Sequence, residues 1–188
     1  MFVNGVHIIE VIIVPKVIEN IREKILLKGK EMLLEGSYSD FNIRNLAKNC
    51  GMGLGTLYNY FENKEVLVFH IFKSDWEKTL QLVDKIKPAN IPLKEKIHKV
   101  FSSLETFISQ YMCIFQELSD GGRKGIPHNY YMEIYLKMKE LLDEEQKAGN
   151  IHNDIGTDKM SYFIMSNIFN VIKNKHLTFN EMYECIRI

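Results

Sequence analysis

The chain has 188 residues, of which 46% are hydrophobic and 26% charged, and its formal net charge at pH 7 is zero. This length and apolar content suffice for one or two folded domains. A neutral total charge excludes a generally polycationic protein, so any nucleic-acid binding has to come from a local motif. No apolar run reaches the roughly 18 residues of a membrane-spanning helix, so we expect no membrane association.

Cysteine and histidine give no sign of a metal centre. The three cysteines, Cys50, Cys113 and Cys185, are widely spaced and form no CxxC pair. We therefore expect neither a zinc site nor a disulfide, but reduced thiols in a cytoplasmic protein. The six histidines are scattered and make no HExxH motif, so no metal or other cofactor is predicted.

The first 15 residues differ from the rest of the chain. Residues 6–15, VHIIEVIIVP, are rich in β-branched side chains and end in proline. The segment has no basic leader or cleavage motif, so we do not expect a signal peptide. It is either a short strand-like arm or an extension from an upstream start, and we treat residues 1–15 as an N-terminal extension.

From Val17 onward the hydrophobic pattern is helical almost throughout. Long helices are predicted over about 17–35 and 64–86, and from Pro92 onward, with two short ones within 43–61. Further helices follow, one of them capped by Thr157 and a final one opened by a capping box of Thr178 and Glu181. No strand pattern appears after residue 15, so the predicted fold is all-α.

The most informative stretch is NIRNLAKNCGMGLGTLYNYFENK, residues 42–64. Asn42 is a good N-cap, and a single apolar face follows it at helical spacing. Gly51 supplies the left-handed residue that ends a helix sharply, and a second helix begins near Leu54. Two short helices joined by a turn containing glycine predict a helix-turn-helix.

The second helix of this motif has two different faces. Leu54, Leu57 and Phe61 fall together at 100° per residue and are expected in the core. The opposite face is small and polar, and it suits a DNA major groove without burying an unpaired charge. Lys64 then adds a positive charge at the start of the next helix, whose N-terminal N–H groups favour a phosphate.

Two neighbouring stretches resemble the DNA-binding region of TetR family regulators, which we call the reading head. They are GTLYNYFENKEVL, residues 55–67, and the preceding NIRNLAKNCGM. The resemblance implies an N-terminal three-helix DNA-binding domain (16–63) and a C-terminal helical ligand-binding and dimerisation domain (64–188). It places phosphate contacts on Asn42, Thr56, Tyr60 and Lys64. It places base-edge or mixed contacts on Arg44, Gly55, Tyr58 and Asn59.

Three positions depart from the family pattern. Gly53 stands where a capping serine is common, which weakens the expected start of the second motif helix. Phe41 replaces a usual threonine. Gly29 stands where alanine is usual, at a cost of about 1 kcal/mol of helix propensity.

The second half is rich in Phe, Tyr and Met, which a helical core alone explains. The resemblance adds a pocket for a largely apolar small-molecule effector. The expected lining residues are Phe101, Phe107, Tyr111, Tyr131, Tyr135 and Met138. A basic glycine-rich stretch, GGRKG at 121–125, is not a phosphate-binding motif and is read as a loop between helices.

We also expect a homodimer, because one helix-turn-helix reads too few base pairs for useful specificity. The helix from Thr157 to about Val171 and the final helix carry more apolar circumference than one-sided packing needs. The expected interface residues are Met160, Phe163, Ile164, Ile168, Val171, Phe179, Met182 and Tyr183. A central helix in a monomer core is the alternative.

The leading hypothesis is a sequence-specific DNA-binding regulator, a repressor released by a small molecule. An all-α enzyme or ligand carrier is the second hypothesis, and it lacks a convergent catalytic set in the sequence. A helical adaptor whose motif no longer binds DNA is the third. We therefore predict a regulator with a double-stranded operator as partner, and not an enzyme.

Overall fold

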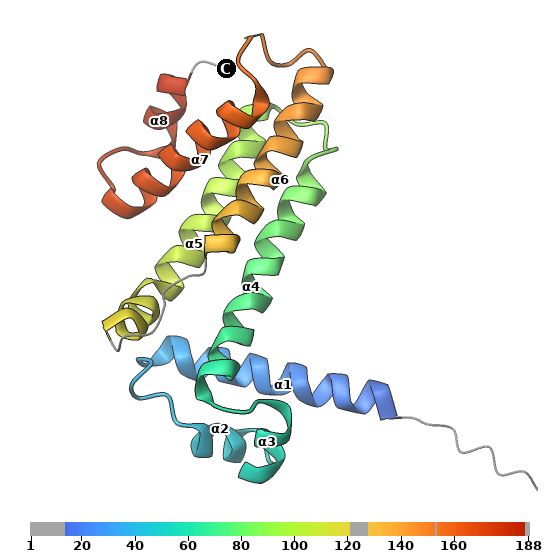
Figure 1. Cartoon of the computed structure of the whole chain (residues 1–188), viewed down its shortest axis with the longest axis vertical. Helices are drawn as coiled ribbons and strands as arrows, with labels where there is room; N and C mark the ends of the chain where they lie inside the picture. The colour runs from blue at the N-terminus through green and yellow to red at the C-terminus, as the bar shows by residue number, and fades with distance from the viewer. Residues whose placement is uncertain (1–13, 121–127, 153, 187–188) are drawn as a thin grey trace, which may run out of the picture. The chain divides into compact units, whose positions relative to one another are not determined.

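The computed structural model describes residues 14–120, 128–152 and 154–186 (Figure 1). They form eight α-helices and no strand, which confirms the all-α prediction for this part of the chain. The helices are α1 Val14–Glu35, α2 Ile43–Asn49, α3 Leu54–Tyr60, α4 Lys64–Ile86, α5 Leu93–Asp120, α6 His128–Lys147, α7 Thr157–Asn174 and α8 Phe179–Ile186. Residues 1–13 and the GGRKG stretch lie outside the described residues.

The helices form two compact units. The first contains residues 14–36 and 40–71, and the second contains 37–39 and the described residues from 72 onward. The chain therefore crosses between the units three times, after residues 36, 39 and 71. The division into these units falls inside α4, between residues 71 and 72, and does not coincide with the predicted domain boundary between residues 63 and 64. That domain boundary stays a prediction.

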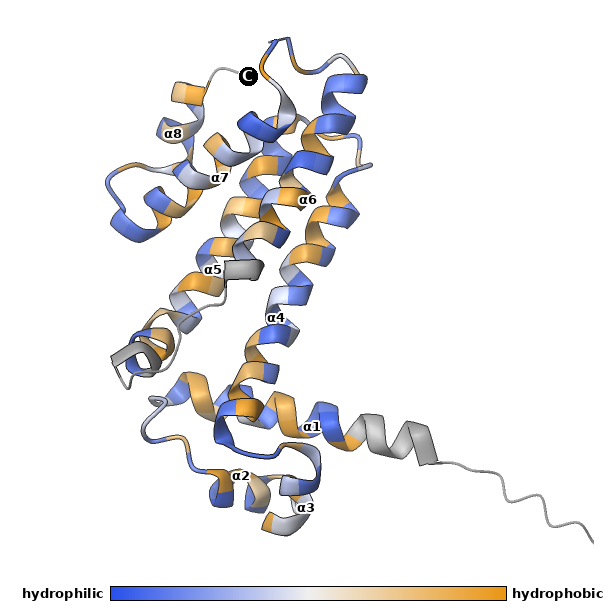
Figure 2. Cartoon of the chain, viewed as in Figure 1, coloured by the Kyte–Doolittle hydropathy of each residue, from blue (hydrophilic) through white to orange (hydrophobic). Residues whose placement is uncertain are grey.

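An apolar core holds the first unit together. Ile25, Leu33, Leu46, Leu57 and Leu67 are each fully buried. Hydrophobic residues alternate with hydrophilic ones along the helices, as Figure 2 shows for α1 and α4. Each helix therefore stabilises the unit through one apolar face rather than through its intrinsic propensity alone.

Two departures from the family pattern have a packing reason in this core. A Cβ at Gly29 would lie 2.9 Å from Ile71 Cδ1 and 3.4 Å from Leu46 Cδ2. Glycine thus lets α1 approach α2 and α4 closely, so the propensity cost expected at this position accompanies tight packing. Phe41 is 4% exposed and fills the core, where threonine would leave space.

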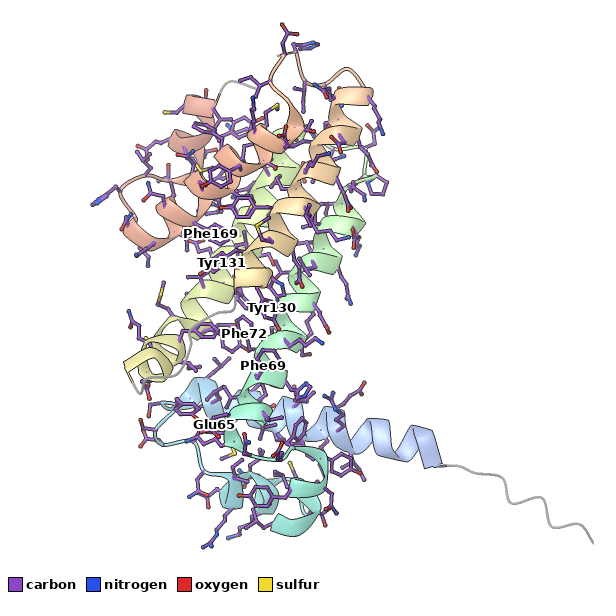
Figure 3. The ribbon with its side chains drawn as sticks, viewed as in Figure 1. Glu65, Phe69, Phe72, Tyr130, Tyr131 and Phe169 are labelled. Atoms are coloured by element: carbon purple, nitrogen blue, oxygen red, sulfur yellow. The ribbon has the colours of Figure 1, made fainter. Side chains whose placement is uncertain are left out.

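In the second unit, α7 packs against α6, α8 and α5, and α8 also contacts α5. An aromatic cluster joins α4 to α5 and α6, because the Phe72 ring lies 4.9 Å from Phe107, 4.7 Å from Phe115 and 5.2 Å from Tyr130. Phe72 and Tyr130 are labelled in Figure 3. These contacts fix the second part of α4 within the second unit.

Polar bonds inside the second unit tie its elements together. Lys96 and Glu145 form an ion pair of 2.6 Å between α5 and α6, and each side chain is only 5% exposed. The Tyr111 hydroxyl donates to Asp75 Oδ2 at 2.7 Å. The short segment 37–39 joins this unit through Ser39, whose N–H and hydroxyl donate to Glu117 Oε2 at 3.0 and 2.9 Å.

The two predicted helix starts near the C-terminus have different outcomes. The capping box at α8 is confirmed, because Thr178 N donates to Glu181 Oε2 at 2.8 Å and Glu181 N donates to Thr178 Oγ1 at 3.3 Å. The bonds that Thr178 donates to this carboxylate from its backbone N–H and from its hydroxyl lower the pKa of Glu181. The predicted cap at Thr157 is wrong, since Gly156 is the N-cap of α7. Thr157 is the first helical residue, and its hydroxyl donates to Asp143 of α6 instead.

Candidate nucleic-acid interface and effector cavity

The first helix of the motif, α2, has the ends that the sequence predicts. Asn42 Oδ1 accepts from Arg44 N at 2.8 Å and from Asn45 N at 3.3 Å. Gly51 lies just after the helix, and its φ of 71° falls in the left-handed region. Lys24 Nζ also donates to the carbonyl of Cys50 at 2.9 Å, a bond from α1 that the sequence reading missed. The left-handed conformation of Gly51 and the bond from Lys24 therefore both fix the turn between α2 and α3.

The second motif helix, α3, begins at Leu54 after Gly53, whose N-cap position makes no side-chain bond. The expected weak start is therefore present. Leu57 and Phe61 are buried as predicted, whereas Leu54 is half-buried. A Cβ at Gly55 would meet nothing within 4 Å, so the protein's own packing does not require glycine there.

The opposite face of α3 is exposed and uncharged. It consists of Gly55, Thr56, Tyr58 and Asn59. Small and amide side chains with a tyrosine hydroxyl can donate and accept hydrogen bonds at base edges and phosphates. This face meets the steric and polar requirements for a helix that enters a major groove.

The start of α4 follows α3 directly. Asn63 Oδ1 accepts from Val66 N at 2.8 Å and caps the helix. Lys64 is half-buried, with Nζ 5.8 Å from the centre of the Phe41 ring, in the range of a cation–π contact. The remaining N–H groups of this helix end and the ammonium together form a positive region.

A second group that the sequence reading missed lies behind α3. Arg22 Nη2 lies 3.0 Å from His70 Nδ1, and its guanidinium lies 5.3 Å from the centre of the Phe61 ring. The His70 ring meets Phe61 edge-on at 5.5 Å. Because Arg22 is in α1, Phe61 closes α3 and His70 is in α4, this group holds the three helices at one point. Spacing within any one helix gives no signal for it.

All eight predicted DNA-contacting residues lie in the first unit, on or next to α2, α3 and the start of α4. Tyr60 and Lys64 are half-buried, and the other six are exposed. The cap and the predicted phosphate contact of Asn42 are compatible. Its side-chain oxygen accepts at the helix start, and its amide N–H groups are the donors that a phosphate needs.

The second unit contains a partly open cavity of about 470 Å³ between α5, α6 and α7. Its lining residues are Phe107, Ile108, Met112, Phe115, Tyr131, Tyr135, Ser166, Phe169 and Lys173. Figure 3 shows Tyr131 and Phe169 in this region, and their rings meet edge-on at 5.3 Å. The Tyr135 hydroxyl lies 3.4 Å from Ser166 Oγ. Burial raises the pKa of Tyr131, so its hydroxyl stays protonated and can donate.

Of the six expected pocket residues, Phe107, Tyr131 and Tyr135 line the cavity, while Phe101, Tyr111 and Met138 do not. Phe101 packs against Phe179 at 5.3 Å, and Met138 is fully buried in the core. Burial and the bond to Asp75 raise the pKa of Tyr111, which keeps this hydroxyl a donor to Asp75. Helical periodicity marks all six as inward-facing, but it does not separate core from cavity.

The expected dimer-interface residues are mostly covered by their own unit. Six of the eight are buried: Met160, Ile164, Ile168, Val171, Phe179 and Met182. Their apolar stripe packs α7 and α8 inside the unit, so their side chains offer little surface to a second copy. Phe163 is 55% exposed and Tyr183 is half-buried. The neighbouring Tyr162 is 67% exposed and stacks on Tyr135.

The arrangement of α2 and α3 defines the class of protein first: it is a helix-turn-helix DNA-binding regulator of transcription. Residues 25–71 match the model of bacterial regulatory proteins of the tetR family. Over these residues the chain resembles the TetR family of transcriptional regulators, and the curated proteins that it matches are regulators of transcription rather than enzymes.

Two curated relatives extend the likeness beyond the reading head. The transcriptional regulator UidR of Escherichia coli K12 is 25% identical over 162 residues, covering 80% of this chain and 79% of UidR. The regulator YhgD of Bacillus subtilis 168 is 26% identical over 125 residues, covering 64% of this chain and 63% of YhgD.

Solved structures share the fold. Salmonella enterica GusR superposes with a TM-score of 0.65 at 16% identity, covering 89% of this chain and 93% of GusR. Bacillus subtilis FadR, solved in complex with stearoyl-CoA, has a TM-score of 0.60 at 17% identity, covering 88% and 97% of the two chains. Among the residues that the structure describes, every helix is too short or too polar to span a lipid bilayer. The described residues also contain no cluster of potential metal ligands.

Proposed function

We propose that this regulator is a cytoplasmic repressor that binds a palindromic operator as a homodimer and leaves it when a small molecule fills the cavity between α5, α6 and α7. The observation that carries the proposal is the exposed, uncharged face of α3 next to the capped start of α4. The two proposed domains keep the boundaries 16–63 for reading DNA and 64–188 for effector binding and dimerisation.

Selection of bound sequences from a random duplex pool tests DNA reading. The proposal expects a palindromic consensus with half-sites about 34–36 Å apart, or a multiple of that spacing. Recovery of no enriched sequence would contradict it. The selected duplex then serves for the variants below.

Roles within the reading head are separated by two kinds of variant. Lys64→Ala is expected to weaken binding to all duplexes and to lower the salt slope by about one, since a phosphate contact releases counterions. Arg44→Ala and Asn59→Ala are expected to relax preference at individual base pairs, by about 1–3 kcal/mol each. Lys85→Ala, at an exposed position in the last turn of α4, is the control for simple loss of a positive charge.

Release by an effector needs a link from the cavity to the reading head. Phe107 and Phe115 line the cavity and also contact Phe72 of α4. Because α4 is one helix that begins at Lys64 in the reading head, a ligand that moves these rings shifts the population of α4 positions. The coupling free energy is then the difference in ligand affinity between the two populations.

Exposed aromatic side chains on α7 support a second copy of the chain as partner. Tyr162 and Phe163 are more than half exposed, and large exposed aromatics are enriched at interfaces. Phe163→Glu is therefore expected to convert a dimer into a monomer in light scattering, with Lys48→Glu, an exposed residue of α2, as control. A wild-type monomer at micromolar concentration would refute the homodimer.

A further inference from the structure

Lys173 is the one charged residue among the described residues that line the cavity. We propose that the cavity binds an amphipathic carboxylate, whose anionic end pairs with Lys173 and whose apolar body lies against the aromatic wall. This inference rests on the proposed function, in which a small molecule occupies the cavity. It adds the chemical class of that molecule.

The wall of the cavity selects an apolar body. Phe107, Phe115 and Phe169 present rings, and Ile108 and Met112 add aliphatic surface from α5. A volume of about 470 Å³ lies within the range of pockets that enclose small organic ligands. Burial of apolar ligand surface against this wall supplies most of the binding free energy, and the flexible Met112 adapts to its shape.

The charge lies at one end of this apolar volume. Ser166, Phe169 and Lys173 follow one another along α7, and two helical turns separate Ser166 from Lys173, about 10 Å along the axis. The uncharged hydroxyls of Tyr135 and Ser166 meet at the first end, and the Tyr131–Phe169 ring pair lies between. A ligand with an apolar body and a terminal negative group matches this order.

The chemistry around Lys173 favours a carboxylate over a phosphate. Lys173 makes no ion pair with another described residue, and an exposed lysine that lines an apolar cavity can keep its ammonium in water while its stem lies along the apolar surface. It stands in the last turn of α7, where the helix carbonyls carry partial negative charge. One lysine neutralises the single charge of a carboxylate, whereas a dianion would keep one negative charge without a counter-ion beside the negative helix end.

A structural role for Lys173 makes a different prediction. A cation in the last turn of a helix stabilises the helix end whether or not a ligand is bound. In that case the charge of a bound amphiphile would not affect its affinity. Matched amphiphiles of different charge therefore separate the two roles.

The single tryptophan supplies a direct readout in the full chain. Trp76 is buried, and its ring lies 5.1 Å from that of Phe107, which lines the cavity. Fluorescence titrations use dodecanoate, dodecanol and dodecylammonium, each below its micelle concentration. Dodecanoate is expected to bind about fivefold tighter than dodecanol, the size of a partly exposed ion pair, and dodecylammonium weaker than either.

Three variants assign the preference to Lys173. Lys173→Met is expected to remove the difference between dodecanoate and dodecanol, and Lys173→Arg to keep it. Lys159→Met, an exposed lysine of α7 outside the cavity lining, is expected to behave as wild type. Circular dichroism checks that each variant is folded. Unchanged preference in folded Lys173→Met would overturn the proposal.

The wild-type comparison needs no variant, so the proposal is testable even where Lys173→Met fails to fold. If dodecanol binds as tightly as dodecanoate, the carboxylate assignment is wrong while the proposed effector cavity stands. If none of the three probes binds, both the carboxylate assignment and the effector cavity are wrong. Binding of the selected operator duplex is measured separately and does not depend on either result.

Discussion

The two units bury different kinds of side chain. All six buried polar or charged side chains among the described residues belong to the second unit: Asp75, Thr79, Lys96, Glu145, Thr157 and Ser161. In the first unit, the described core is apolar, and polar groups serve as helix caps at its surface. Buried polar pairs need matched partners, whereas an apolar core needs mainly volume. Matched pairs of buried polar side chains therefore help to determine the packing of the second unit, whereas the shapes of apolar side chains determine the packing of the first.

The largest expected effect is at the buried ion pair of the second unit. Lys96→Met leaves Glu145 buried without its counter-ion, and we expect a loss of about 3–5 kcal/mol in the free energy of unfolding. Lys96 also donates to the carbonyl of Lys87 at 2.6 Å, which adds to the loss. Urea unfolding followed by Trp76 fluorescence measures it.

The double variant Lys96→Met/Glu145→Leu is the matched control. It removes both charges, so we expect it to recover most of the stability that the single variant loses. A single variant within about 1 kcal/mol of wild type would break the contrast between the units, since an apolar residue would then replace a partner without penalty.

The apolar core of the first unit is expected to respond mainly to side-chain volume. Leu57 is fully buried in α3, and Leu57→Ala should cost about 3 kcal/mol through the cavity that it leaves. Leu57→Met, which conserves volume, should cost less than about 1.5 kcal/mol. Far-UV circular dichroism during urea unfolding provides the measurement. A loss in Leu57→Met as large as in Leu57→Ala would contradict this account.

The smallest expected effect concerns pH. The bond from Lys139, followed by that from Thr157, lowers the pKa of Asp143, which ties α6 to the start of α7. A carboxyl whose pKa is lower in the folded state contributes stability above its unfolded pKa of about 3.9. That contribution is lost as the pH falls through the folded pKa. Asp143→Asn should therefore flatten the acid limb of stability against pH below about pH 4.

Comparison of the pH profiles needs a control on the same helix. Glu144→Gln removes a neighbouring carboxyl that has no bond to α7 among the described contacts, and its profile should follow wild type in this window. An acid limb in Asp143→Asn as steep as in wild type would show that the tie carries no stability.

The helices of the reading head could be predicted from the sequence because the residues that start and end them are close to one another in the chain. Asn42, Gly51 and the spacing of Leu57 and Phe61 fix α2 and α3 within a few residues of each signal. The lining of the cavity could be predicted only in part, because Phe107 and Tyr111 belong to the same helical pattern. Phe107 lines the cavity, whereas the Tyr111 hydroxyl bonds in the core to Asp75, which is 36 residues away in the chain.

Other errors have the same long-range origin. The side-chain bond of Thr157 goes to Asp143 on the preceding helix, so its polar group is not available as a local cap. Lys173 carries no motif, and only the packing of α5, α6 and α7 places it at the cavity. Helix propensity alone makes Gly29 unfavourable, and only the fold shows that a Cβ at this position would crowd the Ile71 side chain.

The three crossings of the chain between the units limit how this regulator can be recombined. A hybrid that joins a foreign reading head to this chain at residues 71 and 72 would lack the short segment 37–39. Glu117 would then lose both donors that Ser39 supplies. The head is thus not an interchangeable cassette. A chimera that retains this unit's own contacts has to carry residues 37–39 as an insert within the foreign sequence.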